Sequence, residues 1–342
     1  MKTNIKNVAL EELGDRVVQW GYPRFHARQI FSWLYQKNAL EFMDMSNIPS
    51  SLRSKLIDNY HCSETKVAEI FESSDGTKKL LLALYENERI EAALISAEKR
   101  ITGCLSSQVG CRFSCAFCAS GSKGFTRNLS SGQILDEVVY LKRCAPKRLL
   151  THVVFMGMGE PFDNYENVLK AVRIINADYG FHIGARRITI STCGIPEGIR
   201  RLARENLQVE LSVSLHAVDD ATRSKLMPVN RKYPLNELFA AIGEYVKTTN
   251  RQVTFEYVVV DGINNGLNDA TKLQTLLKGL NCKVNLIPYN PVEASRLKAP
   301  SLGNIKEFKG FLERRGITVT VRKSRGQDID AACGQLRMRY EN

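Results

Sequence analysis

From Arg100 to the C-terminus, short runs rich in apolar and β-branched residues alternate with longer stretches whose apolar residues repeat at helical spacing. We expect strands at 101–106, 152–156, 187–191, 209–216, 253–260, 283–288 and 317–322. We expect helices near 130–143, 164–176, 195–205, 234–248, 267–279 and 304–314. This alternation predicts an α/β fold in which helices cover a parallel sheet, closed or partly closed as a barrel. About six strand–helix units predict a partial (β/α)6 barrel, fewer than a complete barrel has.

Two smaller units are expected before this barrel. In residues 1–62, apolar residues repeat at helical spacing after a proline that can open a helix. They predict a small helical accessory domain, whose basic side chains suit either an RNA backbone or the solvated face of a capping domain. Residues 63–99 change to the period of strands and predict a β-hairpin extension with arms at 79–85 and 89–95. The barrel and a C-terminal loop then occupy residues 100–342.

The chain carries a strong excess of positive charge. Lys and Arg number 48 against 36 Asp and Glu, which gives a formal net charge of +12 over 342 residues. This excess suits a polyanionic partner such as nucleic acid, although a merely basic protein would show it too. The nine cysteines are odd in number and unevenly spaced, which does not suggest a disulfide framework. The sequence shows neither a signal peptide nor a membrane-spanning run, so we expect a cytoplasmic protein.

The densest group of cysteines lies between Cys104 and Cys118. Cys111, Cys115 and Cys118 follow the spacing C-x3-C-x2-C on a stretch expected to be a loop. Clustered thiolates suit zinc or an iron–sulfur cluster. A structural zinc site needs a fourth Cys or His close by, and the next cysteine is Cys144. Three thiolates suit a [4Fe–4S] cluster with one iron open to a ligand, and a zinc knuckle or a chance group of buried cysteines is the alternative.

Several unusual motifs follow the predicted strands, at the end of a barrel where functional residues gather. The glycines of Gly157-Met-Gly-Glu-Pro161 allow close backbone approach to a ligand, and Glu160 offers a carboxylate to an ammonium or ribose hydroxyl group. Other strands end in Ser191-Thr-Cys-Gly194, Ser214-Leu-His216 and Asn290-Pro291. His216 is either a core histidine or a ligand contact, and its place at a strand end favours the contact.

A further cysteine lies in a small, acidic segment, Gly326-Gln-Asp-Ile-Asp-Ala-Ala-Cys-Gly-Gln-Leu336. Free cysteine is often a small buried hydrophobic residue, so Cys333 has either a packing role or a catalytic one. Cys104, seven residues before Cys111, is not needed as a cluster ligand. The remaining cysteines are expected to be structural: Cys62, Cys144, Cys193 and Cys282.

The cysteine loop, with Phe117 before its last cysteine, resembles the radical S-adenosylmethionine (SAM) superfamily. Nearly the whole chain is similar to the RlmN/Cfr family of radical-SAM RNA methyltransferases. The resemblance rests on this loop with Cys104, on Gly-Met-Gly-Glu-Pro, Ser-Leu-His, Leu-Ile-Pro-Tyr-Asn-Pro and Asp-Ile-Asp-Ala-Ala-Cys-Gly-Gln-Leu, and on the stretch from Gly21 to Trp33. The motif Gly-Met-Gly-Glu followed by a proline, here Pro161, is similar to that of the RlmN branch, whereas the Cfr branch has a different residue after the Glu.

The resemblance implies a radical-SAM barrel with two cofactors. A [4Fe–4S] cluster would be held by Cys111, Cys115 and Cys118, and SAM would bind at its open iron. The implied SAM contacts come from the strand ends: Gly159, Glu160, Ser191, Ser214, Leu215, His216 and Asn290.

The resemblance also implies the roles of three catalytic residues. One SAM methylates Cys333, and hydrogen abstraction from the S-methyl group lets its carbon add to C2 of an adenine. Glu91 removes the C2 proton, although pattern alone would make Glu91 a solvated hairpin carboxylate. Cys104 then attacks the sulfur of Cys333, which releases methylated RNA and leaves a disulfide.

The implied substrates are an adenosine in the peptidyl-transferase centre of 23S rRNA and adenosine 37 of tRNA, each unstacked to reach the site. We also expect an electron donor such as a flavodoxin, no membrane attachment and a monomer. Two alternatives keep the cluster: an adenine-C8 methyltransferase like the Cfr branch, and a redox sensor built on Cys104 and Cys333. An alternative from another class is a zinc-bearing RNA-binding protein without radical chemistry.

Overall fold

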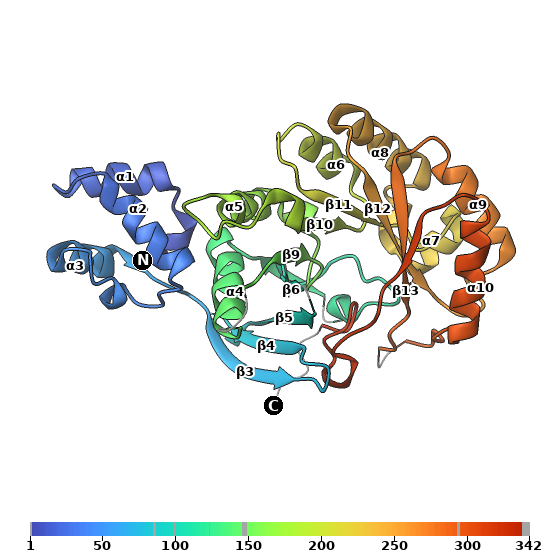
Figure 1. Cartoon of the computed structure of the whole chain (residues 1–342), viewed down its shortest axis with the longest axis horizontal. Coiled ribbons are helices and arrows are strands. Elements are labelled where there is room, and N and C mark those ends of the chain that lie inside the picture. Colours follow the sequence, from blue (N-terminus) through green and yellow to red (C-terminus); the bar gives the residue numbers. More distant parts are fainter. Residues whose placement is uncertain are drawn as a thin grey trace.

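The computed structural model describes residues 2–84, 87–98, 100–122, 124–145, 149–292 and 295–336 (Figure 1). Its largest feature is a sheet of ten strands in the order β14-β13-β12-β11-β10-β9-β6-β5-β4-β3. Strand β6 and strands β9 to β14 pair in parallel with one another. Strands β3 and β14 are the two edges of this sheet, so the barrel is open, and the predicted partial barrel is confirmed.

The parallel strands and the helices between them match the predicted elements to within a few residues. The strands are β6 (Arg100–Cys104), β9 (His152–Phe155), β10 (Ile188–Thr192), β11 (Glu210–Ser214), β12 (Val253–Val259), β13 (Cys282–Pro288) and β14 (Val319–Val321). The helices are α4 (Ser131–Arg143), α5 (Tyr165–Asn176), α6 (Pro196–Ala203), α7 (Asp220–Leu226), α8 (Leu235–Thr249), α9 (Leu267–Leu277) and α10 (Leu302–Glu313). Helix α7 was not predicted, because its seven residues are too few to establish a helical period.

The core lies between the sheet and the helices that surround it in Figure 1. All seven residues of β12 are buried, as expected for a parallel strand that is covered on both faces. Helix α4 begins at a capping box in which the Ser130 side chain accepts from the N–H of Gln133. These elements place the carboxyl ends of six parallel strands around one space, and the loops after the strands line it.

The β-hairpin extension adds three antiparallel strands to the edge of β6: β3 (Lys66–Glu72), β4 (Lys78–Ala83) and β5 (Arg89–Ala97). Strands β4 and β5 are the predicted hairpin. Strand β3 was not predicted, because most of its side chains are exposed and no alternation marks it. Ala93 of β5 lies opposite Cys104 of β6, which ties the extension to the start of the cysteine loop.

Residues before the extension form a helical unit with α1 (Leu10–Gln19), α2 (Phe25–Phe31), α3 (Ser50–Asn59) and the parallel pair β1 (Thr3–Asn4) and β2 (Tyr60–His61). Figure 1 places this unit at the opposite end of the molecule from α9 and α10. The domain boundaries at residues 62 and 99 stay a prediction. None of the described helices combines the length and apolar composition that a membrane-spanning helix needs.

Candidate active site

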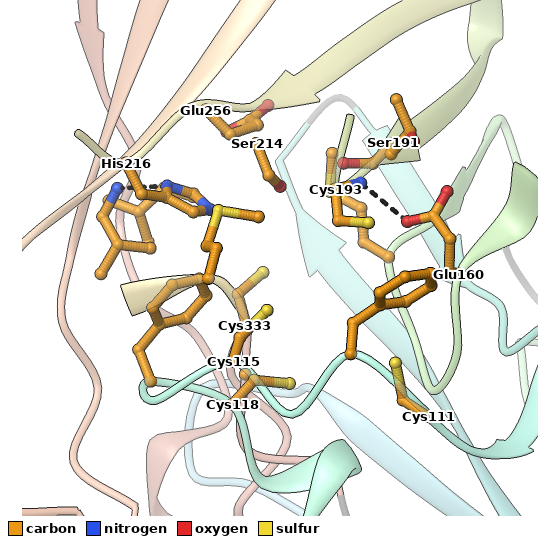
Figure 2. A pocket seen from close by; sticks show the side chains of 18 of the residues that line it. Cys111, Cys115, Cys118, Glu160, Ser191, Cys193, Ser214, His216, Glu256 and Cys333 are labelled. Carbon is orange, nitrogen blue, oxygen red and sulfur yellow. Dashed lines mark hydrogen bonds between the residues drawn. The ribbon is translucent and has the colours of Figure 1, made fainter. Parts of the chain in front are cut away.

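One large pocket lies at the carboxyl ends of β9 to β13, where functional residues of such barrels gather. It encloses about 900 Å³ and is lined by residues from these strand ends, from the cysteine loop and from the Cys333 segment. Figure 2 shows the side chains of Cys111, Cys115, Cys118 and Cys333 around the same space as the strand-end residues. The structure therefore brings together motifs that are spread over more than two hundred residues of sequence.

The three cysteines of the C-x3-C-x2-C motif all line this pocket. Their loop is closed at its base by β7 (Gln108–Gly110) and β8 (Phe125–Asn128), and the N–H of Ala116 donates to Leu226 O over 2.9 Å. Burial raises the pKa of Cys111 to about 12 and raises those of Cys115 and Cys118 as well. These thiols therefore need a metal to hold them as thiolates.

An iron–sulfur cluster and a single zinc ion place different demands on cysteine ligands. Among the described residues, no three His, Cys, Asp or Glu side chains converge closely enough to hold one metal ion. A zinc ion would need every sulfur about 2.3 Å from a common point. A [4Fe–4S] cluster offers a separate iron to each thiolate, so its ligands stand further apart. The three cysteines that line this pocket are the number of thiolate ligands that a [4Fe–4S] cluster with one open iron needs.

Glu160 presents its carboxylate to the pocket from the turn after β9. The side chain is buried, and its two oxygens accept from the N–H groups of Phe162 at 3.0 Å and Cys193 at 2.7 Å (Figure 2). Burial raises the pKa of Glu160, while these hydrogen bonds lower it. Gly159 makes this turn possible: its φ is +95°, and a Cβ there would lie 2.5 Å from the Gln108 side chain.

The ends of β10 and β11 supply Ser191, Ser214 and His216 to the pocket wall. His216 is buried with φ +56°, and its Nδ1 accepts from the N–H of Val258 at 2.9 Å. Burial, with the nearby Arg223, lowers the pKa of His216 to about 3, so the ring is neutral and carries its proton on Nε2. This histidine is a fixed hydrogen-bond donor and not merely a core residue.

Leu215 differs from the other predicted cofactor contacts. Its side chain is fully buried and does not line the pocket. Its backbone N–H already donates to Glu256 O over 3.0 Å, and its carbonyl accepts from Arg223. The place of Leu215 in the SAM site therefore stays a prediction, and a contact there would come from its backbone.

The segment that carries Cys333 is fixed directly against the cysteine loop. Asn290 donates from Nδ2 to Cys333 O over 3.2 Å, and the N–H of Ala119 donates to Gly334 O over 2.7 Å. At the other end of the segment, Asp328 accepts from the Ser73 hydroxyl at 2.6 Å in the turn between β3 and β4. The hairpin extension and the barrel together hold Cys333 at the pocket.

Cys104 lies at the end of β6, buried and beside Cys333. All nine cysteines are free thiols. Burial, together with the neighbouring Cys333, raises the pKa of Cys104 to about 12, while the Arg322 guanidinium lowers it. A buried, protonated thiol of this kind is unreactive until its surroundings change. The two cysteines that the family resemblance pairs are therefore close enough to influence each other electrostatically, although only Cys333 lines the pocket.

Glu91 is placed near this pair but not in the pocket. It is fully buried in β5, on the same sheet face as Ala93 and therefore Cys104, and its Oε1 lies 3.1 Å from Lys79 Nζ. The alternative of a solvated hairpin carboxylate is wrong. Glu91 is not among the residues that line the pocket, so its role in proton removal stays a prediction.

Sequence reasoning missed three charged or sulfur-bearing groups at this site. Arg223 is fully buried and donates to Ser214 O at 3.0 Å and to Cys193 O at 2.8 Å, which joins the loops after β10 and β11. Glu256, in the middle of buried β12, accepts from Asn285 Nδ2 over 2.7 Å and lines the pocket. A charged residue inside an apolar strand was the available signal. Cys193, expected to be structural only, also lines the pocket.

An open parallel barrel with a three-cysteine loop and a strand-end carboxylate in one pocket defines the class of radical SAM proteins. A family model described as the radical SAM superfamily matches residues 105–271. A crystal structure of a radical SAM methyltransferase from Sphaerobacter thermophilus superposes with a TM-score of 0.95 and 46% identity, covering 98% of this chain and 99% of that one. Members of this superfamily use a [4Fe–4S] cluster and SAM, and the residues of this pocket fit both.

The particular family follows from the full-length relatives. A model described as the ribosomal RNA large subunit methyltransferase N-terminal domain matches residues 3–61. The "Probable dual-specificity RNA methyltransferase RlmN" of Syntrophomonas wolfei is 43% identical over 99% of this chain and 98% of its own length. The "Dual-specificity RNA methyltransferase RlmN" of Campylobacter hominis is 42% identical over 98% and 96%. This chain belongs to the RlmN family of RNA methyltransferases.

Proposed function

We propose that this protein methylates C2 of adenosine in 23S rRNA and at position 37 of tRNA, by way of an S-methylcysteine at Cys333. The observation that carries the proposal is that Cys333 and the three-cysteine loop line one pocket, while Cys104 is buried near Cys333 without lining it. The naming of relatives as dual-specificity RNA methyltransferases supports the choice of two RNA substrates. We further propose a monomeric, cytoplasmic enzyme that receives electrons from a flavodoxin-like donor.

The cofactors would be held by residues already placed at the pocket. Cys111, Cys115 and Cys118 would bind the cluster. Bound together, the [4Fe–4S] cluster and SAM supply a radical that can abstract hydrogen from a methyl group. Glu160, held by two backbone N–H groups, would accept hydrogen bonds from the SAM ammonium group. The neutral His216 would donate from Nε2, since its Nδ1 is occupied by Val258.

The hydroxyls of Ser191 and Ser214 and the turn at Gly159 would complete the SAM site. Asn290 has a different part: it already holds the Cys333 carbonyl, and its Oδ1 accepts from Gln327 Nε2 at 2.8 Å. Asn290 would therefore fix the distance between SAM and the methyl-carrying sulfur. Its amide group is already hydrogen-bonded, so its contact with SAM would be limited to packing at the pocket wall. Together these groups orient the reactants and exclude water from the space between them.

The need for Cys333 follows from the chemistry of adenine. The C2 atom is an electrophilic, amidine-type carbon, so it does not attack the methyl group of SAM directly. A methyl group carried on the Cys333 sulfur can add to C2 as a carbon radical after hydrogen abstraction. The C2 proton and the unpaired electron must then leave. We propose that the Glu91 carboxylate accepts the proton, directly or through groups that connect it to the pocket, and that the electron returns to the electron-transfer system that supplied it.

Cys104 would end the covalent attachment. As a thiolate it attacks the Cys333 sulfur, so that the S–S bond forms while the S–C bond breaks. The bonding electrons remain on the carbon, which takes up a proton and becomes the new methyl group. Burial keeps Cys104 protonated in the resting enzyme, which protects the pair from oxidation before RNA is bound. The disulfide must be reduced before the next turnover.

The proposal is tested by nucleoside mass spectrometry. RNA from a host that lacks its own enzyme is compared with and without this chain, and rRNA and tRNA are digested separately. A chain with Cys333→Ala is the control. We expect 2-methyladenosine in both pools, and in neither pool for the Cys333→Ala control. An 8-methyladenosine signal would assign the chain to C8 chemistry, and the absence of any methyladenosine from the intact, iron-loaded chain would contradict the proposed function.

A further inference from the structure

A second, smaller cavity lies on the far side of Cys333 from the large pocket. Its volume is about 320 Å³ when the part open to solvent is included, so an anion bound there would remain partly solvated. The two cavities have four lining residues in common: Ile287, Asn290, Arg322 and Cys333. These residues therefore form a shared wall, and Cys333 is accessible from both sides of it. The other walls of the second cavity differ strongly in character from those of the first.

The second cavity is basic. After β14 the chain runs Arg322-Lys323-Ser324-Arg325, and all four residues line the cavity. Many arginines elsewhere are paired with acids, such as Arg200 with Glu244 at 2.9 Å. Within the part of the chain that the structure describes, Lys323 and Arg325 have no ion pair and no side-chain hydrogen bond. Lys323 is exposed and Arg325 is partly exposed, so the two cations and the Ser324 hydroxyl at this cavity are available to an anion.

Three acidic residues lie near the basic segment, and each already takes part in an interaction: Asp75, Asp328 and Asp330. Asp75 accepts from the N–H of Gly326 at 3.0 Å and from the N–H of Thr77 at 2.9 Å. Asp328 accepts from Ser73 and from the N–H of Ser74 at 3.1 Å. Both carboxylates serve the turn between β3 and β4, so they do not neutralise the cations of the second cavity.

The basic segment is held rigidly relative to Cys333. At its start, the N–H of Arg322 donates to Leu286 O of β13 over 2.8 Å. At its end, Gly326 has φ +67°, and a Cβ there would lie 2.8 Å from Ala331 Cβ. An anion bound to Lys323 and Arg325 would therefore have a fixed position with respect to the sulfur two residues beyond Ala331.

We infer that this second cavity is the subsite for a backbone phosphate that adjoins the target adenosine, bound by Lys323, Ser324 and Arg325. The inference rests on the proposed function and adds to it the direction from which RNA approaches. SAM would occupy the large pocket, so the nucleotide would reach the Cys333 sulfur from the other side of the shared wall. Phosphate contacts of this kind position a nucleic acid and leave the choice of base to other groups.

The test uses direct binding of a stem-loop RNA whose loop contains the target adenosine, measured by fluorescence anisotropy over a series of salt concentrations. The variant is Lys323→Gln with Arg325→Gln. Its matched control is Lys306→Gln with Arg204→Gln, which removes the same charge from exposed positions in α10 and in the turn after α6. We expect roughly tenfold weaker binding for the variant at low salt, and a salt slope reduced by about 1 relative to the control. The charge-keeping pair Lys323→Arg with Arg325→Lys should retain most of the binding.

A second measurement removes negative charge from the RNA instead of positive charge from the protein. The phosphates on either side of the target adenosine are replaced, one at a time, by uncharged methylphosphonates. At one of the two positions we expect the replacement to weaken binding by the wild-type chain and to add no further loss in the Lys323→Gln/Arg325→Gln variant. Additive losses at both positions, or a variant that matches its control, would overturn the inference. Failure of the wild-type chain to methylate adenosine would instead contradict the proposed function itself.

Discussion

The contact between the helical unit and the barrel contains a fully buried ion pair whose loss should be measurable. Lys6 lies in the short helical turn Ile5–Asn7, and its Nζ is 2.8 Å from Asp136 Oδ1 on α4. Neither side chain is exposed to solvent. Lys6 also donates to the Cys62 carbonyl, while Asp136 Oδ2 accepts from Asn4 Nδ2 at 3.1 Å. The pair therefore joins three separate segments of the chain.

The Lys6→Met substitution keeps the length of the side chain and removes its charge. Loss of one partner of a buried pair costs about 3–5 kcal/mol, because the other charge stays buried without compensation. Asp136 keeps two donors, Asn4 Nδ2 and the N–H of Glu64 at 3.2 Å, so we expect the lower end, about 3 kcal/mol. Adding Asp136→Asn removes the uncompensated charge and keeps an acceptor, and this double variant should recover most of the loss.

The assay is urea unfolding together with hydrogen exchange of peptides from residues 2–62 and from α4, because a chain of several units need not unfold in one step. A matched control is Lys170→Met. Lys170 also crosses this contact, but it donates only to the carbonyl of Asn7, a bond whose loss costs about 1 kcal/mol. If Lys6→Met destabilised the contact no more than Lys170→Met does, or if Asp136→Asn gave no recovery, the reasoning from buried charge would be refuted.

Three further predictions concern the active site. Gly334→Ala places a Cβ 2.9 Å from the Phe117 carbonyl oxygen at a φ of +84°. The Cys333 segment must therefore shift, and mass spectrometry of the folded variant should show methylation of Cys333 slowed at least roughly tenfold. An unchanged rate would contradict the packing described. The pKa of His216 is lowered to about 3 in the folded state, so its contribution to stability is present above the unfolded pKa of about 6.5 and is lost as pH falls toward 3. Wild-type unfolding free energy should therefore fall more steeply below pH 6.5 than that of His216→Gln, and parallel pH profiles would exclude this assignment. Cys104→Ala should accumulate a covalent protein–RNA adduct on denaturing gels, whereas a redox-sensor role for the pair predicts none.

The barrel could be predicted from sequence because each of its elements has a strong local signal. Strands such as β12 are continuous apolar runs, and helices such as α4 have both a cap and a repeating apolar face. Since parallel strands end on the same side of a sheet, the motifs after them could be expected to meet. The elements that were missed, β3 and α7, are an exposed edge strand and a single short helix, in which neither signal has room to develop.

The contacts within the site were harder to predict because they depend on the three-dimensional arrangement. Lys6 and Asp136 are 130 residues apart, and no repeating pattern in the sequence indicates that they pair. Lys6 also has the sequence context of a surface lysine. Arg223 gave no signal either, although it joins two strand-end loops from inside the core. Glu91 was found only through the family resemblance, which also decided between a packing and a catalytic role for Cys333. The structure then added the second cavity, which depends on the folding of the basic segment against the Cys333 loop.

The central claim is that the transferred carbon passes through Cys333, and isotope tracing tests it most directly. Reconstituted enzyme is first methylated on Cys333 with SAM that carries a trideuterated methyl group, freed of excess reagent, and then allowed one turnover on RNA with unlabelled SAM. The account predicts 2-methyladenosine whose methyl group retains two of the three deuterium atoms, because one is abstracted while the group is on the Cys333 sulfur. A product methyl group with three deuterium atoms, or with none, would contradict the account.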